Sequence, residues 1–391
     1  MNSSLVVFLK EFRENLRDRR TVLNALITGP LIGPLIFVML INIMISRQLS
    51  QAEGPLRLPV IGATNAPNLI AELRQQGLDP QPPVADPIAA VRNRDVAAVL
   101  RIPPAFGESW HTGEPAQVEI YYDSSRRETQ QVVNRLKEMV QRYSRLTGAM
   151  RLVARGLSST LASPVLVDER DQSTPQSRAG ALFSILPYFF VLTVFIGGMY
   201  LAIDLTAGER ERQSLEPLFV NPVAPWRILL GKVAAICVFS ACSLLICIVA
   251  FTVAGRFIPT EKLGMALGLG PVFAVEVLVL MLPLVLLIAA LETLVAAFSK
   301  SFREAQTYLS LLMLIPILPS IMLSLFPVKT ASWMYAVPLL SQQVAITELL
   351  LGGSVTAAQI GTCLVCGFAV AALMLAVTAR VYGSERLAIS V

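Results

Sequence analysis

Six long apolar runs constrain the fold of this 391-residue chain more than any other feature of its sequence. At about 1.5 Å per helical residue, a run of about 20 residues crosses the roughly 30 Å of hydrocarbon in a bilayer. The runs lie at Val22–Ile45, Ala179–Ile203, Ile228–Ala254, Pro271–Ala297, Ala305–Phe326 and Gly361–Val381. Charged residues make up only 15% of the chain, against about 25% in soluble proteins. The sequence therefore predicts an α-helical polytopic membrane protein with six transmembrane helices.

The distribution of lysine and arginine predicts how these helices are oriented. The short segments on one side of the predicted membrane carry thirteen of these residues, and those on the other side carry three. Because positive charge accumulates in short cytoplasmic segments, both termini are predicted to be cytoplasmic. A cleaved signal peptide is the competing interpretation of the first run, but the run is too long and no small-residue cleavage site follows it. The net charge of +5 does not indicate nucleic-acid binding, because no basic stripe with interleaved aromatics occurs.

Residues 46–178 are polar, rich in proline and arginine, and contain no run of spanning length. They are predicted to form an extracytoplasmic α/β domain inserted between transmembrane helices 1 and 2. Its expected strands and helices follow from alternating and helical apolar patterns. The strands are Leu58–Ala63, Val96–Ile102, Val118–Tyr122 and Pro164–Val167, and the helices are Asn68–Gly77 and Glu128–Arg155. The only histidine, His111, is interpreted as a surface residue on a loop.

The two remaining regions belong to the membrane. Residues 1–21 predict an amphipathic cytoplasmic helix that lies in the membrane interface ahead of the first span, residues 22–45. Its apolar face consists of Leu5, Phe8, Leu9, Phe12 and Leu16. Residues 179–391 are the predicted membrane domain with helices 2 to 6. Within it, Leu339–Leu351 is a short apolar helix, expected to be either re-entrant or surface-lying.

The cytoplasmic loop predicted at residues 204–227 is the only strongly charged segment in the second half of the chain. A helix is expected over Ala207–Val220, because acidic residues near its start complement the helix dipole. Leu215, Leu218 and Phe219 make an apolar face at spacings of three and four. That face predicts a docking surface for a soluble cytoplasmic partner. A solvated turn that only sets the topology is the alternative.

Residues 208–223, GERERQSLEPLFVNPV, resemble the cytoplasmic segment of type-2 ABC exporter permeases, in particular the sodium-extrusion (NatB-like) family. In that family the segment reads G-E-[RK]-E-R-x-[ST]-L-E-x-L-[LF]-x-x-P-V. The resemblance implies that it is a coupling helix that docks into a separate ATPase subunit. The residues to which it extends this role are Glu209, Arg210, Glu211, Arg212, Leu215, Glu216, Leu218 and Phe219.

The resemblance also implies partners and a substrate class. Six helices are half of the usual exporter set, so a dimer with a second permease copy or a paralogue is expected in the bacterial inner membrane. ATP and Mg are expected on the ATPase, and no cofactor on this chain, because Gly231-Lys232 is followed by Val233 and makes no P-loop. The family implies sodium efflux, while related permeases export drugs, peptides and lipids.

Three carboxylates in or beside the predicted spans form a candidate intramembrane polar pathway: Asp204, Glu276 and Glu292. Charged groups at this depth are costly, so each needs a reason to be there. For Glu276 the alternative is an interfacial side chain. For Glu292 the alternative is structural pairing with Arg210 or Arg303.

No catalytic or metal site is predicted, since neither H-E-x-x-H nor G-x-S-x-G occurs. All five cysteines fall in predicted spans, and Cys363-x-x-Cys366 is interpreted as a pair of small apolar residues. A secondary transporter driven by an ion gradient, or another self-contained membrane protein, is the rival class. Such a transporter usually shows internal repeats, and this sequence shows none. Co-purification of an ATPase separates these classes.

Overall fold

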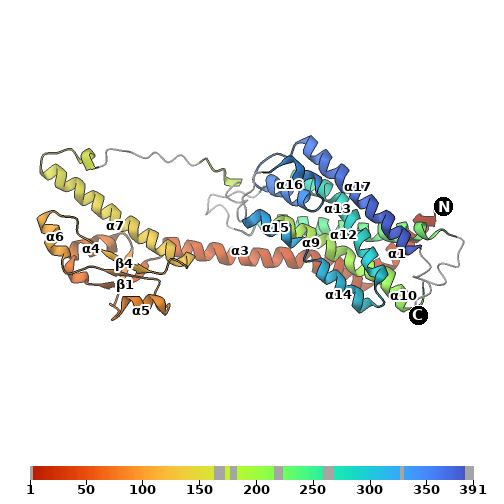
Figure 1. Cartoon of the computed structure of the whole chain (residues 1–391), viewed down its shortest axis with the longest axis horizontal. Helices are drawn as coiled ribbons and strands as arrows, with labels where there is room; N and C mark the ends of the chain where they lie inside the picture. Colours follow the sequence, from red (N-terminus) through yellow and green to blue (C-terminus); the bar gives the residue numbers. More distant parts are fainter. Residues whose placement is uncertain are drawn as a thin grey trace. The chain divides into compact units, whose positions relative to one another are not determined.

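The computed structural model describes residues 3–162, 172–176, 183–214, 223–258, 268–325 and 330–383. The chain divides into two compact units (Figure 1). Met1–Ile43 and Gln172–Val391 form the helical unit, and Met44–Asp171 form the α/β unit. Each unit has a hydrophobic core of its own.

Six helices among the described residues are long and apolar enough to cross a membrane. They are Arg19–Ser46, Leu186–Glu211, Pro225–Gly255, Pro271–Phe298, Phe302–Leu323 and Ala357–Tyr382. Each covers most of one predicted apolar run, so the prediction of six helices of spanning length is confirmed.

The first of these helices is irregular near its start. α2 (Arg19–Val22) leads into a π-helical turn (Leu23–Thr28), and α3 (Gly29–Glu53) follows. The sequence predicts an interruption at Gly29-Pro30 and Gly33-Pro34, and the structure has it one turn earlier. Gly29 itself allows close packing, because a Cβ there would lie 2.6 Å from Ile196 of the next span.

The fifth span is broken. α14 (Phe302–Leu312) and α15 (Ile317–Leu325) are separated by turns at residues 313–316. The span predicted over Ala305–Phe326 is present, but it consists of two helices and not of one regular helix. Pro316 explains the break, because it has no N–H to donate and its ring clashes with the preceding turn.

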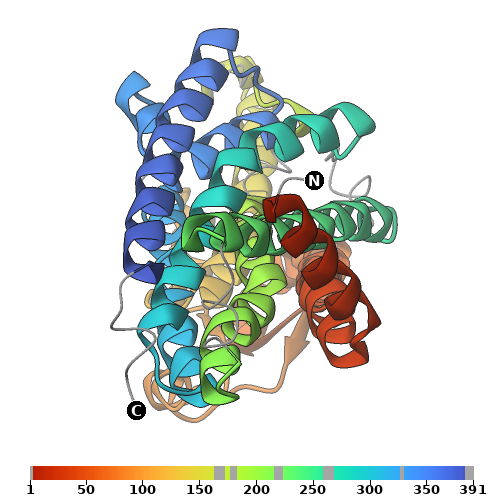
Figure 2. The ribbon, with the colours of Figure 1, turned by 90° about the vertical axis from the view of Figure 1, so that its right-hand side faces the viewer.

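Three spans form the centre of the helical unit. α9 (Leu186–Ile203), α12 (Pro225–Gly255) and α13 (Pro271–Phe298) contact one another, and α17 (Ala357–Tyr382) packs along α13 (Figures 1 and 2). Small residues allow this approach, as is common between membrane helices. Large apolar side chains on α3, α15 and α17 point outward, which suits contact with hydrocarbon.

The short helix predicted at Leu339–Leu351 is packed inside the helical unit. α16 (Leu340–Leu350) follows a 3₁₀ turn (Ser332–Ala336) and contacts α9, α13 and α15. Gln343 is buried, donates to the Pro316 carbonyl at 2.9 Å and accepts from the Ser320 hydroxyl at 2.9 Å. Whether this helix is re-entrant or lies at the membrane surface stays a prediction, but its glutamine is satisfied by neighbouring elements of the helical unit.

The N-terminal helix packs on the third span. α1 (Ser3–Arg17) lies against α12, and Phe12 meets Phe239 edge-on with ring centroids 5.7 Å apart. Leu5, at the start of the predicted apolar face, is about half exposed, while the charged residue Glu11 is buried. The predicted helix is confirmed. Only part of its apolar face is left for a membrane interface, because the rest covers α12.

The α/β unit is built on a four-stranded sheet in the order β2-β1-β3-β4. Its strands are β1 (Leu56–Ile61), β2 (Leu78–Gln81), β3 (Ala98–Arg101) and β4 (Glu119–Tyr122). β1 pairs in parallel with β2 and β3, and β4 is antiparallel to β3. Alternate residues of a strand face opposite sides of the sheet, so both faces need cover.

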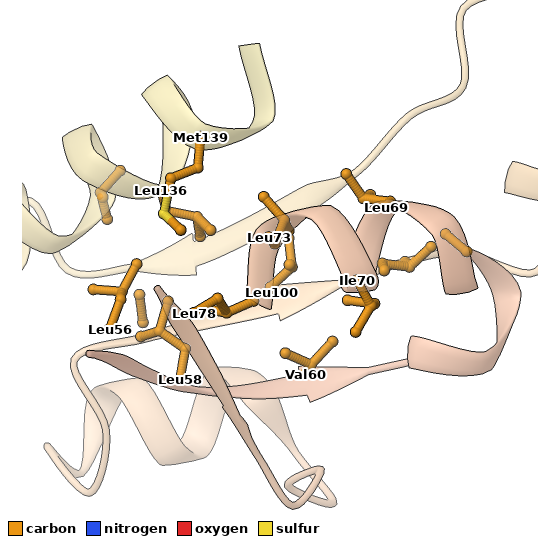
Figure 3. Packing of buried hydrophobic residues seen from close by; sticks show 14 of the residues in the cluster. Leu56, Leu58, Val60, Leu69, Ile70, Leu73, Leu78, Leu100, Leu136 and Met139 are labelled. Carbon is orange, nitrogen blue, oxygen red and sulfur yellow. The ribbon is translucent and has the colours of Figure 1, made fainter. Parts of the chain in front are cut away.

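Helices supply that cover. α4 (Pro67–Gln75) and α7 (Arg127–Ala154) lie over one face of the sheet, and α5 (Pro87–Arg92) lies over the other (Figure 1). α6 (Phe106–Thr112) adds an aromatic side chain to the same core. Figure 3 shows the apolar side chains between sheet and helices, which include Leu56, Leu58, Val60, Leu69, Ile70, Leu73, Leu78, Leu100, Leu136 and Met139.

Three of the predicted strands and both predicted helices of this region are confirmed, with ends shifted by a few residues. Strand β2 was not predicted, because its LDPQ segment is rich in residues that disfavour strands. His111 is exposed as predicted, but it lies on α6 and not on a loop. The strand predicted at Pro164–Val167 lies outside the described residues.

Candidate functional site

The carboxyl end of the second span differs from the helix predicted there. α9 continues through a π-helical turn (Asp204–Gly208) into α10 (Glu209–Glu211), and Gln213 follows with a left-handed φ of 56°. The separate helix predicted over Ala207–Val220 is wrong in its start, because its first turn is the last turn of the span. Four predicted docking residues lie outside the described residues: Leu215, Glu216, Leu218 and Phe219. Their role stays a prediction.

A buried lysine ties this end of the second span to two other helices. The Lys232 side chain, near the start of α12, is 0% exposed. Its ammonium donates to the Leu205 carbonyl at 2.8 Å and to the Glu209 carboxylate. It also lies 5.8 Å from the ring centroid of Tyr382, at the end of α17. Since a dehydrated ammonium is tolerated only when it is paired, these contacts hold the three elements together.

This arrangement changes the role of Glu209. The resemblance assigns Glu209 to the ATPase contact, yet its side chain is only 13% exposed and is turned toward Lys232. Lys232 is one of the thirteen basic residues that predict the orientation of the spans, and its burial was not expected from the sequence. The sequence does contain an indication of this burial. Lys232 is a single charge in an otherwise apolar stretch, LLGKVAAI, where a solvated side chain is not expected.

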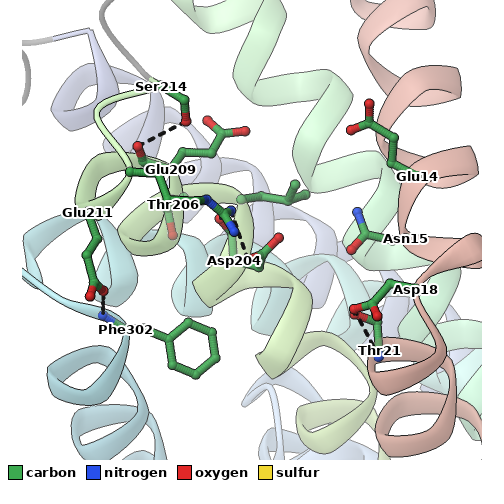
Figure 4. Close-up of polar contacts among 12 residues, drawn as sticks. Glu14, Asn15, Asp18, Thr21, Asp204, Thr206, Glu209, Glu211, Ser214 and Phe302 are labelled. Atoms are coloured by element: carbon green, nitrogen blue, oxygen red, sulfur yellow. Dashed lines mark hydrogen bonds and ion pairs between the residues drawn. The ribbon is translucent and has the colours of Figure 1, made fainter.

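The other charged residues at this end also have partners within the chain. Arg212 donates to the Asp204 carboxylate at 2.9 Å, which folds the helix end back on itself. The Glu211 carboxylate accepts the Phe302 backbone N–H at 2.9 Å, at the start of α14 (Figure 4). A carboxylate beside the first turn of α14 is favourable, because the N–H groups at the start of a helix lack partners within the helix.

Arg210 reaches the carboxyl end of α13. Its guanidinium donates to the carbonyls of Ala297 and Ser299 at 3.5 and 3.4 Å, where the helix leaves carbonyls without partners. The predicted pairing of Glu292 with Arg210 or Arg303 is therefore wrong. Glu292 is fully buried without a hydrogen-bond partner among the described residues, and Arg303 is exposed.

The three predicted pathway carboxylates have three different surroundings. Asp204 is paired with Arg212, Glu276 is partly buried, and Glu292 is enclosed. Sixteen residues separate Glu276 from Glu292 on α13, which is about 24 Å along the helix. A continuous path through all three stays a prediction.

The cysteines lie on two spans, as predicted. Three are on α12 and two on α17, and all five are free thiols. Cys363 is buried and accepts a long hydrogen bond from the Gln342 amide at 3.5 Å. Within the described ranges, no group of three or more His, Cys, Asp or Glu side chains could hold a metal ion.

These contacts make residues 204–212 a junction of several helices. Lys232 connects the segment to α12 and α17, Arg210 connects it to α13, and Glu211 connects it to α14. The segment cannot shift far without moving those helices or separating buried charges, which is costly. It is therefore placed to pass a displacement between its neighbouring residues and the spans.

Comparison with known proteins identifies the class to which this helical arrangement belongs. Residues 28–380 match the family described as ABC-2 family transporter protein. The match covers most of the chain, so the protein belongs to the ABC-2 transporter family, as the GERERQSLEPLFVNPV segment indicates. It is a multi-pass membrane protein and an ABC transporter permease subunit.

One relative matches over nearly the whole length. The chain is 26% identical over 352 residues to the ABC transporter permease protein NatB of Bacillus subtilis strain 168, which covers 88% of this chain and 89% of the relative. No solved structure matches. The resemblance to NatB-like permeases is thus confirmed.

Proposed function

We propose that this chain is the membrane subunit of an ATP-driven sodium exporter in the bacterial inner membrane. Both termini and residues 204–227 lie in the cytoplasm, and the α/β unit lies outside. A separate ABC ATPase binds ATP and Mg²⁺, and a second permease copy or a paralogue completes the dimer. The thirteen-to-three asymmetry of basic residues supports this orientation, and the NatB-like segment supports the substrate and the partner.

The observation that carries the proposal is the buried contact of Lys232 with Glu209 and the Leu205 carbonyl. A partner that pulls on residues next to Glu209 moves a helix end that is bonded to α12 and lies against α17. Such a bonded junction is what an ATPase needs in order to rearrange spans that it does not touch. A topological turn needs no buried charge pair.

The contacts at the junction also assign different roles, transmission and docking, to different residues within 204–227. Glu209 faces Lys232, so we assign it to transmission of the movement. Docking falls to the predicted apolar face of Leu215, Leu218 and Phe219, whose burial would contribute roughly 1.5–3 kcal/mol per side chain. Glu211 orients the segment against α14 through its bond to the Phe302 N–H.

The docking assignment is tested by Leu215→Asp combined with Phe219→Asp. Loss of two apolar contacts should weaken ATPase binding by about a hundredfold or more. The measurement is recovery of the ABC ATPase on the tagged permease, with membrane insertion and dimer formation as checks on assembly.

Gln213→Asp is the control for an added carboxylate, because it places one negative charge on an exposed neighbour in a conformation that Asp tolerates. This variant should retain the ATPase. If the double variant also retains the ATPase at the wild-type level, the segment is only a turn and the coupling assignment is wrong.

The substrate is tested in vesicles that contain the reconstituted permease–ATPase complex. ATP should drive sodium movement, and sodium should stimulate ATP hydrolysis where choline does not. ATP hydrolysis that coupled to the permease but ignored sodium would contradict the substrate and leave the permease role intact.

A further inference from the structure

Glu292 is the one acidic side chain among the described residues that is both 0% exposed and without a hydrogen-bond partner on either carboxyl oxygen. It lies on α13, six residues before the helix ends at Phe298, which is about 9 Å along the axis. The junction at residues 204–212 does not use it. A carboxyl group in this position needs an explanation of its own.

The surroundings of Glu292 are tightly packed. A Cβ on Gly198 of α9 would lie 2.7 Å from the Glu292 Oε2 atom, 2.6 Å from the Ser240 Oγ atom and 2.9 Å from Ile236 of α12. The Ser240 hydroxyl is also buried, with no hydrogen-bond partner among the described residues. Glycine at position 198 therefore gives the carboxyl its room, and these two polar groups face the same small space between α9, α12 and α13.

No positive charge among the described residues neutralises the carboxyl. Lys232 is eight residues from Ser240 on α12, about 12 Å along the axis, and is committed to Glu209. Arg210 is bonded to carbonyls at the end of α13, and Arg380, near the end of α17, is exposed. The Cys237 thiol of α12 is a titratable side chain near enough to interact electrostatically with Glu292.

An ionised carboxylate without a counter-charge or a donor is too costly in such surroundings. A hard metal ion would need several oxygen ligands. Among the described neighbours of Gly198, the oxygen that joins the carboxyl is the Ser240 hydroxyl. A proton needs no cavity and only one oxygen. The neutral carboxylic acid is therefore the form that fits.

We propose that Glu292 is a proton-binding site between α9, α12 and α13, occupied in this packed arrangement of the three helices. When these helices separate during transport and water enters, the carboxyl group releases its proton to water, and the carboxylate binds a monovalent metal cation whose other oxygen ligands are water molecules. The exchange conserves charge, since one cation replaces another on the same oxygen. This second step rests on the proposed sodium export, whereas the occupied proton site does not.

The proton site is tested by thermal unfolding of the purified permease as a function of pH, in wild type and in Glu292→Gln. Glutamine is neutral and of similar size, so it imitates the acid that keeps its proton. A group that is protonated when folded and ionised when unfolded adds stability at low pH that is lost as pH rises. Relative to Glu292→Gln, the wild-type unfolding constant should rise about tenfold per pH unit above the ordinary range of a glutamate.

Glu276→Gln is the matched control, because Glu276 is a partly buried carboxyl group on the same helix. Its pH profile should run parallel to that of the wild type. Parallel profiles for Glu292→Gln as well would overturn the proposal, whatever the stability of that variant, since the carboxyl would then hold no proton that folding protects.

A second measurement needs no variant. The infrared carbonyl band of a carboxylic acid should persist in wild-type permease at neutral pH, where exposed carboxyl groups are ionised. Its absence would overturn the proposal even if Glu292→Gln failed to assemble.

The exchange step is tested by adding sodium or choline at alkaline pH. Sodium should raise the melting temperature of the wild type and leave that of Glu292→Gln unchanged. No effect of sodium would contradict the exchange step. If the vesicles show no sodium export but the pH profiles differ, the substrate assignment fails and the proton site stands.

Discussion

At the scale of single residues, two buried ionisable side chains of the helical unit have opposite surroundings. Lys232 is enclosed but has a carboxylate, a carbonyl and an aromatic face around its ammonium. Glu292 is enclosed with no such partner among the described residues. The difference follows from position, because Lys232 lies beside the end of the second span and reaches its Leu205 carbonyl, whereas Glu292 lies within α13 beside α9 and α12.

The pairing of Lys232 can be measured by a double-mutant cycle. Lys232→Met leaves the Glu209 carboxylate without its partner and should lower the free energy of unfolding by about 3–5 kcal/mol. Glu209→Gln should also destabilise the permease, and the combined variant should recover much of the loss because no charge is left unpaired. Unfolding in detergent gives the three values. Additive losses would contradict a coupled pair.

At the scale of elements, the close contact of α9 with α12 depends on two adjacent glycines. A Cβ at Gly197 would lie 2.5 Å from the Ser243 hydroxyl, and one at Gly198 would meet Ser240 and Glu292. Small residues at such crossings let helices approach without the water-driven force that acts in soluble proteins. Ser240, Ser243 and Glu292 can therefore lie close to α9 because Gly197 and Gly198 have no side chains.

Gly198→Ala tests this contact. The added methyl group should force α9 away from α12 and α13 and lower the stability by about 1–3 kcal/mol. Gly361→Ala on α17 is the control, because nothing lies within 4 Å of the added atom, and it should be neutral or stabilise the helix by about 0.5–1 kcal/mol. Equal melting temperatures for the two variants would show that the contact is loose.

At the scale of the whole molecule, one chain combines a helical unit with six helices of spanning length and an α/β unit with its own sheet and core. The second unit is inserted between the first and second spans in the sequence. The proposed orientation places all of the inserted unit on one side of the membrane, since no spanning run lies within residues 46–178.

Reporter fusions test this orientation. A reporter that works only outside the cytoplasm should be active at Trp110, in the α/β unit, and inactive at Gln213 or Phe302. A reporter that works only inside should give the reverse pattern. A cytoplasmic signal at Trp110 would invert the assignment of every loop, because the six spans alternate in direction.

Much of the fold could be predicted from local pattern. The six apolar runs, the α7 stripe and the strands β1, β3 and β4 are recognisable because length and periodicity act within one segment. β2 could not be predicted, since it is held by its parallel pairing with β1 and not by its own residues. The break between α14 and α15 was missed although Pro316 was visible, because proline is often tolerated in spans.

The sequence by itself determined the class of this protein, the number of its spans and the segment that ties it to its family. Those properties depend on the length of the apolar runs and on a short motif, and both can be recognised without knowing any tertiary contact. Only the tertiary structure decided which charges are enclosed and with what. Glu209 is 23 residues from Lys232, and Glu292 lies far along the chain from Gly198. Burial and pairing are properties of the space between helices, and helices from distant parts of the chain enclose that space.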